Sequence, residues 1–208
     1  MANFIAEKIS AQNLPADILV SFDALFAEAL GAGEPDRTAM VLATATADGW
    51  PSSRTVLLKS HGAHGFVFYT HMDGRKGREL QANPRAALLF HWPRVRDGVQ
   101  VRIEGDVVLV DDVEADKYFA SRPRGSQLGA WASLQSETLP DRGIFEQRLD
   151  DAERQFEGRD VLRPARWTGF TVVPHAVEFW YGAQYRLHER YLHERDAAGN
   201  WSARMLYP

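Results

Sequence analysis

The sequence predicts an antiparallel β-barrel with helices packed on it, a mainly β protein of the α+β class. Short runs of apolar and β-branched residues follow one another from Ala39 onward. These runs cluster without a helix between each pair, which argues against a parallel sheet built from alternating strands and helices. No Pro/Ser-rich linker divides the 208 residues. We therefore expect a single domain over residues 1–208.

The N-terminal part is predicted to contain an arm and one helix. Residues 1–16 show no convincing period and are interpreted as an extended arm that ends near Pro15. Between Ile18 and Leu30 apolar residues recur at helical spacing, and Gly31 and Gly33 stop the pattern. We expect an amphipathic helix that lies on the core.

The rest of the chain is predicted to be mostly strands, with a tight turn at Asp48-Gly49. Strands are expected at Met40–Thr46, Arg54–Leu58, Gly65–Thr70, Ala86–His91, Val99–Val110, Thr168–Val173, Val177–Tyr181, Tyr185–Glu194 and Trp201–Leu206. Helices are expected at Arg75–Ala82, where Asn83-Pro84 ends the pattern, at Val113–Ser121 and in the charged segment Asp141–Phe156.

The composition excludes several kinds of protein. There is no cysteine, so disulfides, thiolate metal sites and cysteine nucleophiles are ruled out. The net charge of -4 argues against a general affinity for nucleic acid or for an anionic membrane. No apolar stretch reaches membrane-spanning length, and the N-terminus lacks the pattern of a secretory signal, so we expect a cytoplasmic protein.

Three motifs do not support the chemistry that they suggest at first sight. Gly31-Ala-Gly33 follows a helical pattern and lacks the third glycine of a dinucleotide fingerprint. His188 and His193 are five residues apart, which in a strand places them on opposite faces, so no metal site is expected. Ser126 lies in Gly-Ser-Gln-Leu-Gly, which lacks the geometry of a nucleophile elbow.

Two groups of residues are suited to binding phosphate. A phosphate dianion needs several N–H or O–H donors, each charge-assisted bond contributing about 1.5–3 kcal/mol. Arg75-Lys76 opens a predicted helix, whose N-terminal amides reinforce the side chains. Tyr118, Arg122 and Ser126 are spaced by four along a helix and its exit, so they are expected on one face. The alternative is that these cations belong to a solvated surface.

A series of short motifs, taken together, resembles the pyridoxine/pyridoxamine 5'-phosphate oxidase family over about residues 14–208. In the family's order they are Arg54-Thr-Val-Leu-Leu-Lys59, Phe68-Tyr-Thr70, Arg75-Lys76, Lys117-Tyr-Phe-Ala-Ser-Arg-Pro-Arg124, Ser126-Gln-Leu-Gly-Ala-Trp131, Gln135-Ser136, Glu178-Phe-Trp180 and Arg186-Leu-His188 with Arg190. No single motif is specific, but the ordered set is.

The resemblance implies an FMN-binding split β-barrel that forms a homodimer with FMN at the interface. It implies oxidation of pyridoxamine or pyridoxine 5'-phosphate by O2, giving pyridoxal 5'-phosphate and H2O2. The residues implied to contact FMN are Arg54, Thr55, Val56, Leu57, Leu58, Lys59, Tyr69, Thr70, Arg75, Lys76, Gln100, Gln135, Ser136, Trp180 and Arg190. Those implied to contact the substrate are Lys59, Tyr118, Arg122, Ser126, Arg186, Leu187 and His188.

Arg186 and His188 are the expected catalytic residues. As strand residues two apart they would point to the same face, where Arg186 stays charged and positions an oxygen of the substrate. His188 would orient the substrate or exchange a proton with it.

Three other functions remain open. A related FMN oxidase of phenazine biosynthesis shares the barrel and an Arg-Leu-His-Glu-Arg stretch, but a phenazine precursor has no phosphate for Lys59, Tyr118, Arg122 and Ser126 to hold. A non-catalytic flavin-binding protein on the same barrel is a second alternative. A small nucleic-acid-binding barrel is disfavoured by the net charge. The segment Met1–Asn13, with Lys8 as its only cation, is shorter than the basic lid of many family members.

Overall fold

The computed structural model describes residues 13–208. Its helices are α2 (Ala16–Gly31), α3 (Arg75–Ala82), α4 (Asp112–Ser121), α5 (Arg124–Ala132) and α6 (Arg142–Gln155), with a short 3-10 helix, η1, at Gln184–Arg186. Its strands are β1 (Ala39–Ala45), β2 (Pro51–Leu57), β3 (Ser60–Gly62), β4 (Gly65–His71), β5 (Arg85–Trp92), β6 (Val99–Leu109), β7 (Trp167–Tyr181), β8 (Glu189–Arg195) and β9 (Trp201–Leu206).

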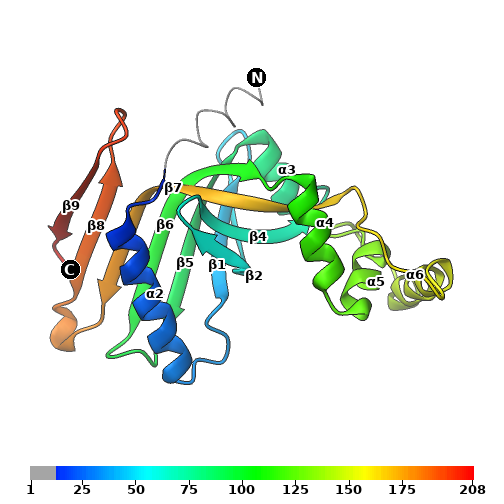
Figure 1. Ribbon diagram of the computed structural model, residues 1–208, viewed down its shortest axis with the longest axis horizontal. Helices are drawn as coiled ribbons and strands as arrows, with labels where there is room; N and C mark the ends of the chain where they lie inside the picture. Colours follow the sequence, from blue (N-terminus) through cyan, green and yellow to red (C-terminus); the bar gives the residue numbers. More distant parts are fainter. Residues whose placement is uncertain (1–12) are drawn as a thin grey trace.

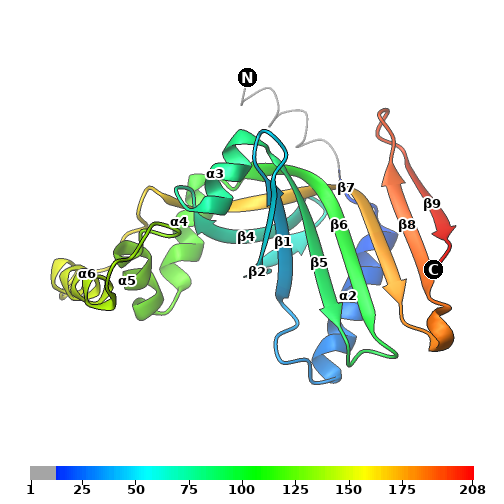
Figure 2. The ribbon, with the colours of Figure 1, turned by 180° about the vertical axis from the view of Figure 1, so that it is seen from behind.

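All the strands of the described residues belong to one curled antiparallel sheet, as Figures 1 and 2 show. The order β2-β1-β5-β6-β7-β4-β3 forms the main path, and β8 and β9 continue from β7. This confirms the predicted antiparallel, mainly β fold with packed helices. None of the helices described is long and apolar enough to cross a membrane.

Strand β7 is the branch point of the sheet. One edge of β7 pairs with β6 along its length, while the other edge pairs first with β4, through Trp167–Val172, and then with β8, through Ala176–Tyr181. Between the two halves the register shifts by one residue opposite Gly105. A Cβ at Gly105 would lie 2.2 Å from the carbonyl oxygen of Val173, so this irregularity requires glycine.

Helix α2 covers one face of the sheet and closes the main core. Ile18, Phe22, Leu25 and Ala29 are buried at helical spacing, as the sequence predicts. The ring of Phe22 meets the rings of two strand residues edge-on, Phe66 at 5.0 Å and Phe90 at 5.3 Å between centroids. The helix begins at Ala16 rather than Ile18. The predicted arm at 1–16 falls mostly on residues 1–12, outside the described part.

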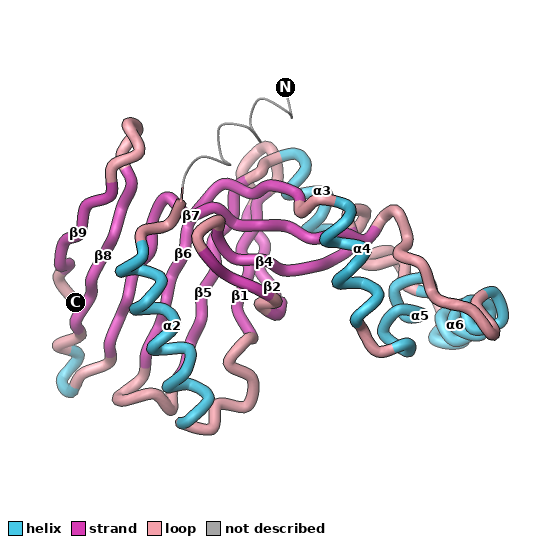
Figure 3. Tube along the Cα trace, in the orientation of Figure 1, coloured by secondary structure: helices cyan, strands magenta, loops and turns pink. Residues whose placement is uncertain are grey.

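Helices α4, α5 and α6 form a separate layer at the end of the molecule opposite β8 and β9 (Figure 3). They enclose a second apolar cluster, which includes Phe119, Leu128, Phe156 and Trp167. Because Trp167 begins β7, this cluster attaches the helices directly to the sheet.

Several predicted boundaries are wrong. The predicted strands at 168–173 and 177–181 are one strand, β7, because the register shift accommodates Pro174 within the sheet. Helix α5 and strand β3 were not predicted. The predicted strand at 185–194 begins only at Glu189, since residues 184–187 form a turn in which Tyr185 and Arg186 have φ of 56° and 63°.

Candidate active site

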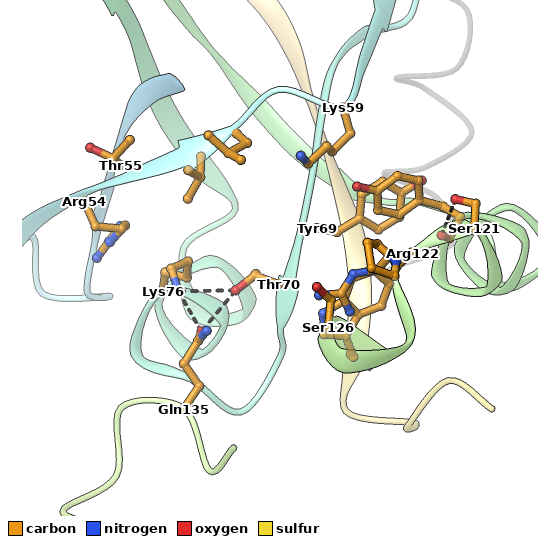
Figure 4. Close-up of a pocket in the computed structure, with 15 residues that line it drawn as sticks. Arg54, Thr55, Lys59, Tyr69, Thr70, Lys76, Ser121, Arg122, Ser126 and Gln135 are labelled. Atoms are coloured by element: carbon orange, nitrogen blue, oxygen red, sulfur yellow. Dashed lines mark hydrogen bonds between the residues drawn. The ribbon is translucent and has the colours of Figure 1, made fainter. Parts of the chain in front are cut away.

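A cavity of about 530 Å³ opens between β2, β4, α3 and the junction of α4 with α5 (Figure 4). Its lining residues are Arg54, Thr55, Val56, Leu57, Lys59, Tyr69, Thr70, Lys76, Tyr118, Ser121, Arg122, Pro123, Ser126, Gln135 and Trp167. Polar donors gather at two places in this lining, and β2 runs from one to the other.

The first group of donors surrounds Lys76, near the start of α3. Lys76 Nζ donates to Gln135 Oε1 at 2.6 Å and to Thr70 Oγ1 at 3.2 Å, and Thr70 Oγ1 also donates to Gln135 Oε1 at 3.0 Å. Burial, followed by the positive charge of Arg54, lowers the pKa of Lys76. Since both hydrogen-bond partners of this lysine are neutral, an anion in the cavity is its natural counter-charge.

Arg54 lies beside Lys76 and is held by the protein on several sides. Its NH1 donates to Thr44 Oγ1 at 2.5 Å, and its NH2 donates to Ser52 Oγ and, at 3.2 Å, to Glu79 Oε2. The neighbouring Arg75 donates through Nε to Glu79 Oε1 at 2.9 Å, but its side chain is 60% exposed and does not line the cavity.

The second group of donors consists of Lys59, Tyr118, Arg122 and Ser126. The guanidinium of Arg122 lies 4.8 Å from the ring centroid of Trp167, and its NH1 is buried without a hydrogen-bond partner among the described residues. Burial lowers the pKa of Arg122 and raises that of Tyr118, so the tyrosine keeps its proton and remains a donor. An anion with several oxygens fits this group.

One continuous helix face does not explain why Tyr118, Arg122 and Ser126 converge, contrary to our expectation. Pro123 lacks an N–H and ends the α4 segment, so Tyr118 lies on α4, Arg122 follows its last residue and Ser126 lies on α5. The three residues meet because the chain turns between two helices. Stacking of Tyr118 on Tyr69, at 4.0 Å between ring centroids, further ties α4 to β4.

Another set of predicted residues lies on β6, β7 and β8, away from the cavity. Gln100, Trp180 and Arg190 are direct neighbours across these three strands. Arg190 is held by the buried Glu178, with Nε to Oε1 at 2.7 Å and NH2 to Oε2 at 3.2 Å. Figures 1 and 2 show β8 at the end of the molecule opposite α4 and α5.

Arg186, Leu187 and His188 lie in the turn before β8, so the expectation that Arg186 and His188 share a strand face is wrong. His188 packs on Trp180, with ring centroids 4.4 Å apart. Its Nδ1 accepts the backbone N–H of Ala183 at 3.2 Å, so the neutral ring carries its proton on Nε2. Within the described residues no group of His, Asp or Glu side chains is arranged to hold a metal ion.

The predicted site residues therefore form two separate groups in one chain. Leu58 belongs to neither, since it is 4% exposed in the core, and Ser136 lies outside the lining, where its Oγ accepts the N–H of Arg75 at 3.1 Å. Sequence reasoning missed Ser121, Pro123 and Trp167 in the lining, and it also missed Glu79. Glu79 could have been found from the sequence, because it lies four residues after Arg75 on a predicted helix, where the two side chains can pair.

Family models match both parts of the chain. Residues 26–156 match the model described as "Pyridoxamine 5'-phosphate oxidase". The chain belongs to the pyridoxamine 5'-phosphate oxidase family. Residues 167–208 match the model described as "Pyridoxine 5'-phosphate oxidase C-terminal dimerisation region". Membership confirms the expected protein class, an FMN-dependent oxidase with FMN as its cofactor.

Similar proteins agree with this family. The pyridoxine/pyridoxamine 5'-phosphate oxidase of Xanthomonas euvesicatoria is 59% identical over 197 residues, which cover 94% of this chain and 99% of the relative. The enzyme of that name from Xylella fastidiosa is 58% identical over 200 residues and 96% of each chain.

Solved structures support the split-barrel fold. PhzG from Burkholderia lata, solved with tetrahydrophenazine-1-carboxylic acid, superimposes with a TM-score of 0.86 at 33% identity over 93% of this chain and 94% of its own. A pyridoxamine 5'-phosphate oxidase-related, FMN-binding protein from Nostoc punctiforme has a TM-score of 0.69 at 20% identity, over 89% of this chain and 96% of its own, and so shows the fold alone.

The cavity residues fit FMN. The phosphate of FMN needs cations and neutral donors together, and Arg54, Lys76 and Thr70 supply both at one place. Lys76, whose hydrogen-bond partners among residues 13–208 are neutral, would gain a counter-charge from such a phosphate. The adjoining stretch Thr55–Leu57 lines the rest of the cavity towards Lys59 and leaves room for a ring system.

Proposed function

We propose that the chain oxidises pyridoxamine 5'-phosphate and pyridoxine 5'-phosphate with O2, yielding pyridoxal 5'-phosphate and H2O2; the amine also consumes one water and releases ammonia. The observation that carries the proposal is the pair of donor groups in one cavity. One group, around Arg54 and Lys76, suits the phosphate of FMN, and the other, around Arg122, suits the phosphate of the substrate.

In this proposal, binding of the substrate phosphate positions the substrate relative to the flavin. FMN held by Arg54, Lys76 and Thr70 would supply the two-electron oxidation at the C4' position of the substrate, with O2 as the final oxidant. Lys59, Tyr118, Arg122 and Ser126 hold the substrate phosphate, which fixes the distance of C4' from the cofactor. The aromatic rings of Tyr69, Tyr118 and Trp167 form one side of the cavity and restrict the access of water.

The second group of predicted residues, on β6, β7, β8 and the turn before β8, is called the C-terminal group and supplies the remaining roles. Arg186 holds an oxygen of the substrate ring through the planar fork of its guanidinium. His188, whose Nδ1 is occupied by the Ala183 N–H, presents its Nε2 proton as a donor. Gln100, Trp180 and Arg190 contact the flavin.

A homodimer accounts for the separation of the two groups. Within one chain the residues of β8 and the turn before it are too far from the cavity to act there, as Figures 1 and 2 indicate. The match of residues 167–208 to a dimerisation region supports a second copy of the chain that brings its C-terminal group to this cavity. FMN would then bind at the interface between the two subunits.

A second candidate is oxidation of a phenazine precursor, favoured by the similarity to PhzG. Arg122 NH1, which has no hydrogen-bond partner in the described part of the chain, and the phenol of Tyr118 favour the B6 substrates, because these donors match a phosphate with several oxygens.

The decisive experiment compares substrates on the purified protein. H2O2 release is measured with the two phosphorylated vitamers, with pyridoxine and pyridoxamine, and with tetrahydrophenazine-1-carboxylic acid. We expect the phosphorylated vitamers to have a kcat/KM at least about 100-fold above that of the unphosphorylated forms. Equal kcat/KM values for the phosphorylated and unphosphorylated vitamers would contradict a site for the substrate phosphate. Fastest oxidation of tetrahydrophenazine-1-carboxylic acid would establish the second candidate. A protein that takes up no FMN would refute both.

A further inference from the structure

We propose that Glu79 is a positioning residue for the phosphate of FMN, because it fixes Arg54 on the sheet relative to Arg75 and Lys76 on α3. The proposal rests on the assignment of FMN to the cavity. Glu79 is in none of the motifs that carry the family resemblance.

Both carboxylate oxygens of Glu79 accept hydrogen bonds. Oε1 accepts the Nε–H of Arg75 at 2.9 Å, from one turn earlier on α3. Oε2 accepts from Thr44 Oγ1 at 2.5 Å, from Ser52 Oγ at 2.6 Å and from Arg54 NH2 at 3.2 Å. One side chain thus connects α3 to β1 and β2.

The carboxylate is ionised and enclosed. Glu79 is 5% exposed, and although burial by itself raises its pKa, the hydrogen bonds from Ser52, Thr44 and the two arginines lower the pKa to about 2. The negative charge is therefore present wherever the protein is folded near neutral pH. It also acts on Lys76, whose pKa it raises against the effects of burial and of Arg54.

The arrangement sets direction as well as charge. Arg54 NH1 donates to Thr44 Oγ1 and to the carbonyl oxygen of Leu42, and NH2 is shared between Ser52 Oγ and Glu79, so the plane of the guanidinium is fixed. Thr44 is 3% exposed, so this hydroxyl cannot turn to water instead. Without Glu79, Arg54 would keep its neutral partners but lose the charged one. Its charge would then repel Arg75 and Lys76 without a carboxylate between them.

The direct test is Glu79→Gln, which keeps the shape but places an amide N–H₂ among donors. FMN and riboflavin are titrated into the apoprotein, with flavin fluorescence as the readout, and unfolding of the apoprotein is followed separately. We expect the Kd for FMN to rise about 10- to 100-fold and the Kd for riboflavin, which has no phosphate, to change less than about 3-fold. At saturating FMN the KM for the phosphorylated substrate stays at the wild-type value.

The matched control is Glu28→Gln. Glu28 also forms a two-point pair with an arginine, Arg96, but lies on α2, away from the cavity. Its removal leaves both flavin affinities unchanged. A double-mutant cycle with Arg54→Ala adds a second readout, since Glu79→Gln then costs less FMN affinity than it does in the wild-type background.

The outcomes separate the two proposals. If the wild type binds no FMN, the proposed function fails. If the wild type binds FMN and Glu79→Gln binds it equally well or more tightly, the positioning role is refuted; an equal loss of riboflavin affinity refutes it too, because it shows only a structural effect. Should Glu79→Gln not fold, Thr44→Val and Ser52→Ala remove donors to the carboxylate one at a time, and unchanged FMN affinity in both overturns the proposal.

Discussion

The cavity and the C-terminal strands contain the same kind of glutamate–arginine pair in different surroundings. Each has a buried glutamate that holds an arginine of the candidate site: Glu79 holds Arg54, and Glu178 holds Arg190. Around the cavity the donors come from strands and helices that enclose a space, whereas Arg190 lies on an open sheet beside the turn that carries Arg186. Both regions are built within one chain, and in the proposed dimer each would supply half of a site.

The largest expected effect tests whether the two regions act across a dimer. Arg122→Ala removes a cavity donor, and Arg186→Ala removes the charge of the C-terminal turn, so each variant purified alone retains at most about a tenth of the wild-type kcat/KM while FMN remains bound. When the two variants are unfolded together and refolded, random pairing gives heterodimers with one intact site, and about a quarter of the wild-type activity returns.

The readout is H2O2 release before and after mixing. Refolding each variant alone is the control and restores nothing. Absence of recovery in the mixture, with heterodimers shown to be present, would mean that both regions of a site come from one chain.

The next effect separates the substrate phosphate from the rest of the substrate. Arg122→Ala should lower kcat/KM for pyridoxine 5'-phosphate by about 10- to 150-fold, the worth of one charge-assisted hydrogen bond, and leave kcat/KM for pyridoxine unchanged. Arg142→Ala, an exposed arginine on α6, is the matched control without effect. An equal loss for both substrates would assign Arg122 to the ring instead of the phosphate.

A smaller effect concerns the acid stability of the cavity region. Burial, followed by the charge of Arg166, lowers the pKa of His71 from 6.5 to about 4. Between these values the unfolded chain binds a proton that the folded chain does not, so acidification from pH 6.5 to 4 weakens folding through this residue, by up to about 3 kcal/mol, and the loss levels off below pH 4.

Urea unfolding of the apoprotein between pH 7 and 4 measures this dependence. His71→Gln should flatten it, whereas His64→Gln, at an exposed histidine, should not. If the two variants have the same pH dependence as the wild type, His71 is protonated in the folded state.

The smallest expected effect concerns two exposed ion pairs, whose contribution to the free energy of unfolding depends on burial more than on the region in which they lie. Arg78–Glu137, near the cavity, and Arg204–Glu194, on the C-terminal strands, are both exposed pairs. Glu137→Gln and Glu194→Gln should each change the free energy of unfolding by less than about 1 kcal/mol, and less in high salt. A larger change in only one region, measured by urea unfolding, would show that the two regions differ in more than their buried glutamates.

Local patterns predicted most of the elements. Helix α3 was placed at its observed bounds because Asn83-Pro84 ends the helical pattern, and β5 and β6 were recovered within a residue or two. The failures have local causes. Gly125 and Gly129 weaken the helical pattern of α5, and Pro174 suggests a strand break although β7 continues through it. The positive φ of Tyr185 is rare for a residue with a side chain, so the turn before β8 was not expected.

The residue types and their order determined by themselves the family, the antiparallel fold and the kinds of donor a phosphate needs, because these depend on local periodicity and on the chemistry of single side chains. Only the tertiary structure decided that Tyr118, Arg122 and Ser126 meet through two helices, that Glu79 joins α3 to the sheet, and that Arg186 and Arg190 lie apart from the cavity. Those relations depend on contacts between residues distant in sequence, which no local pattern specifies.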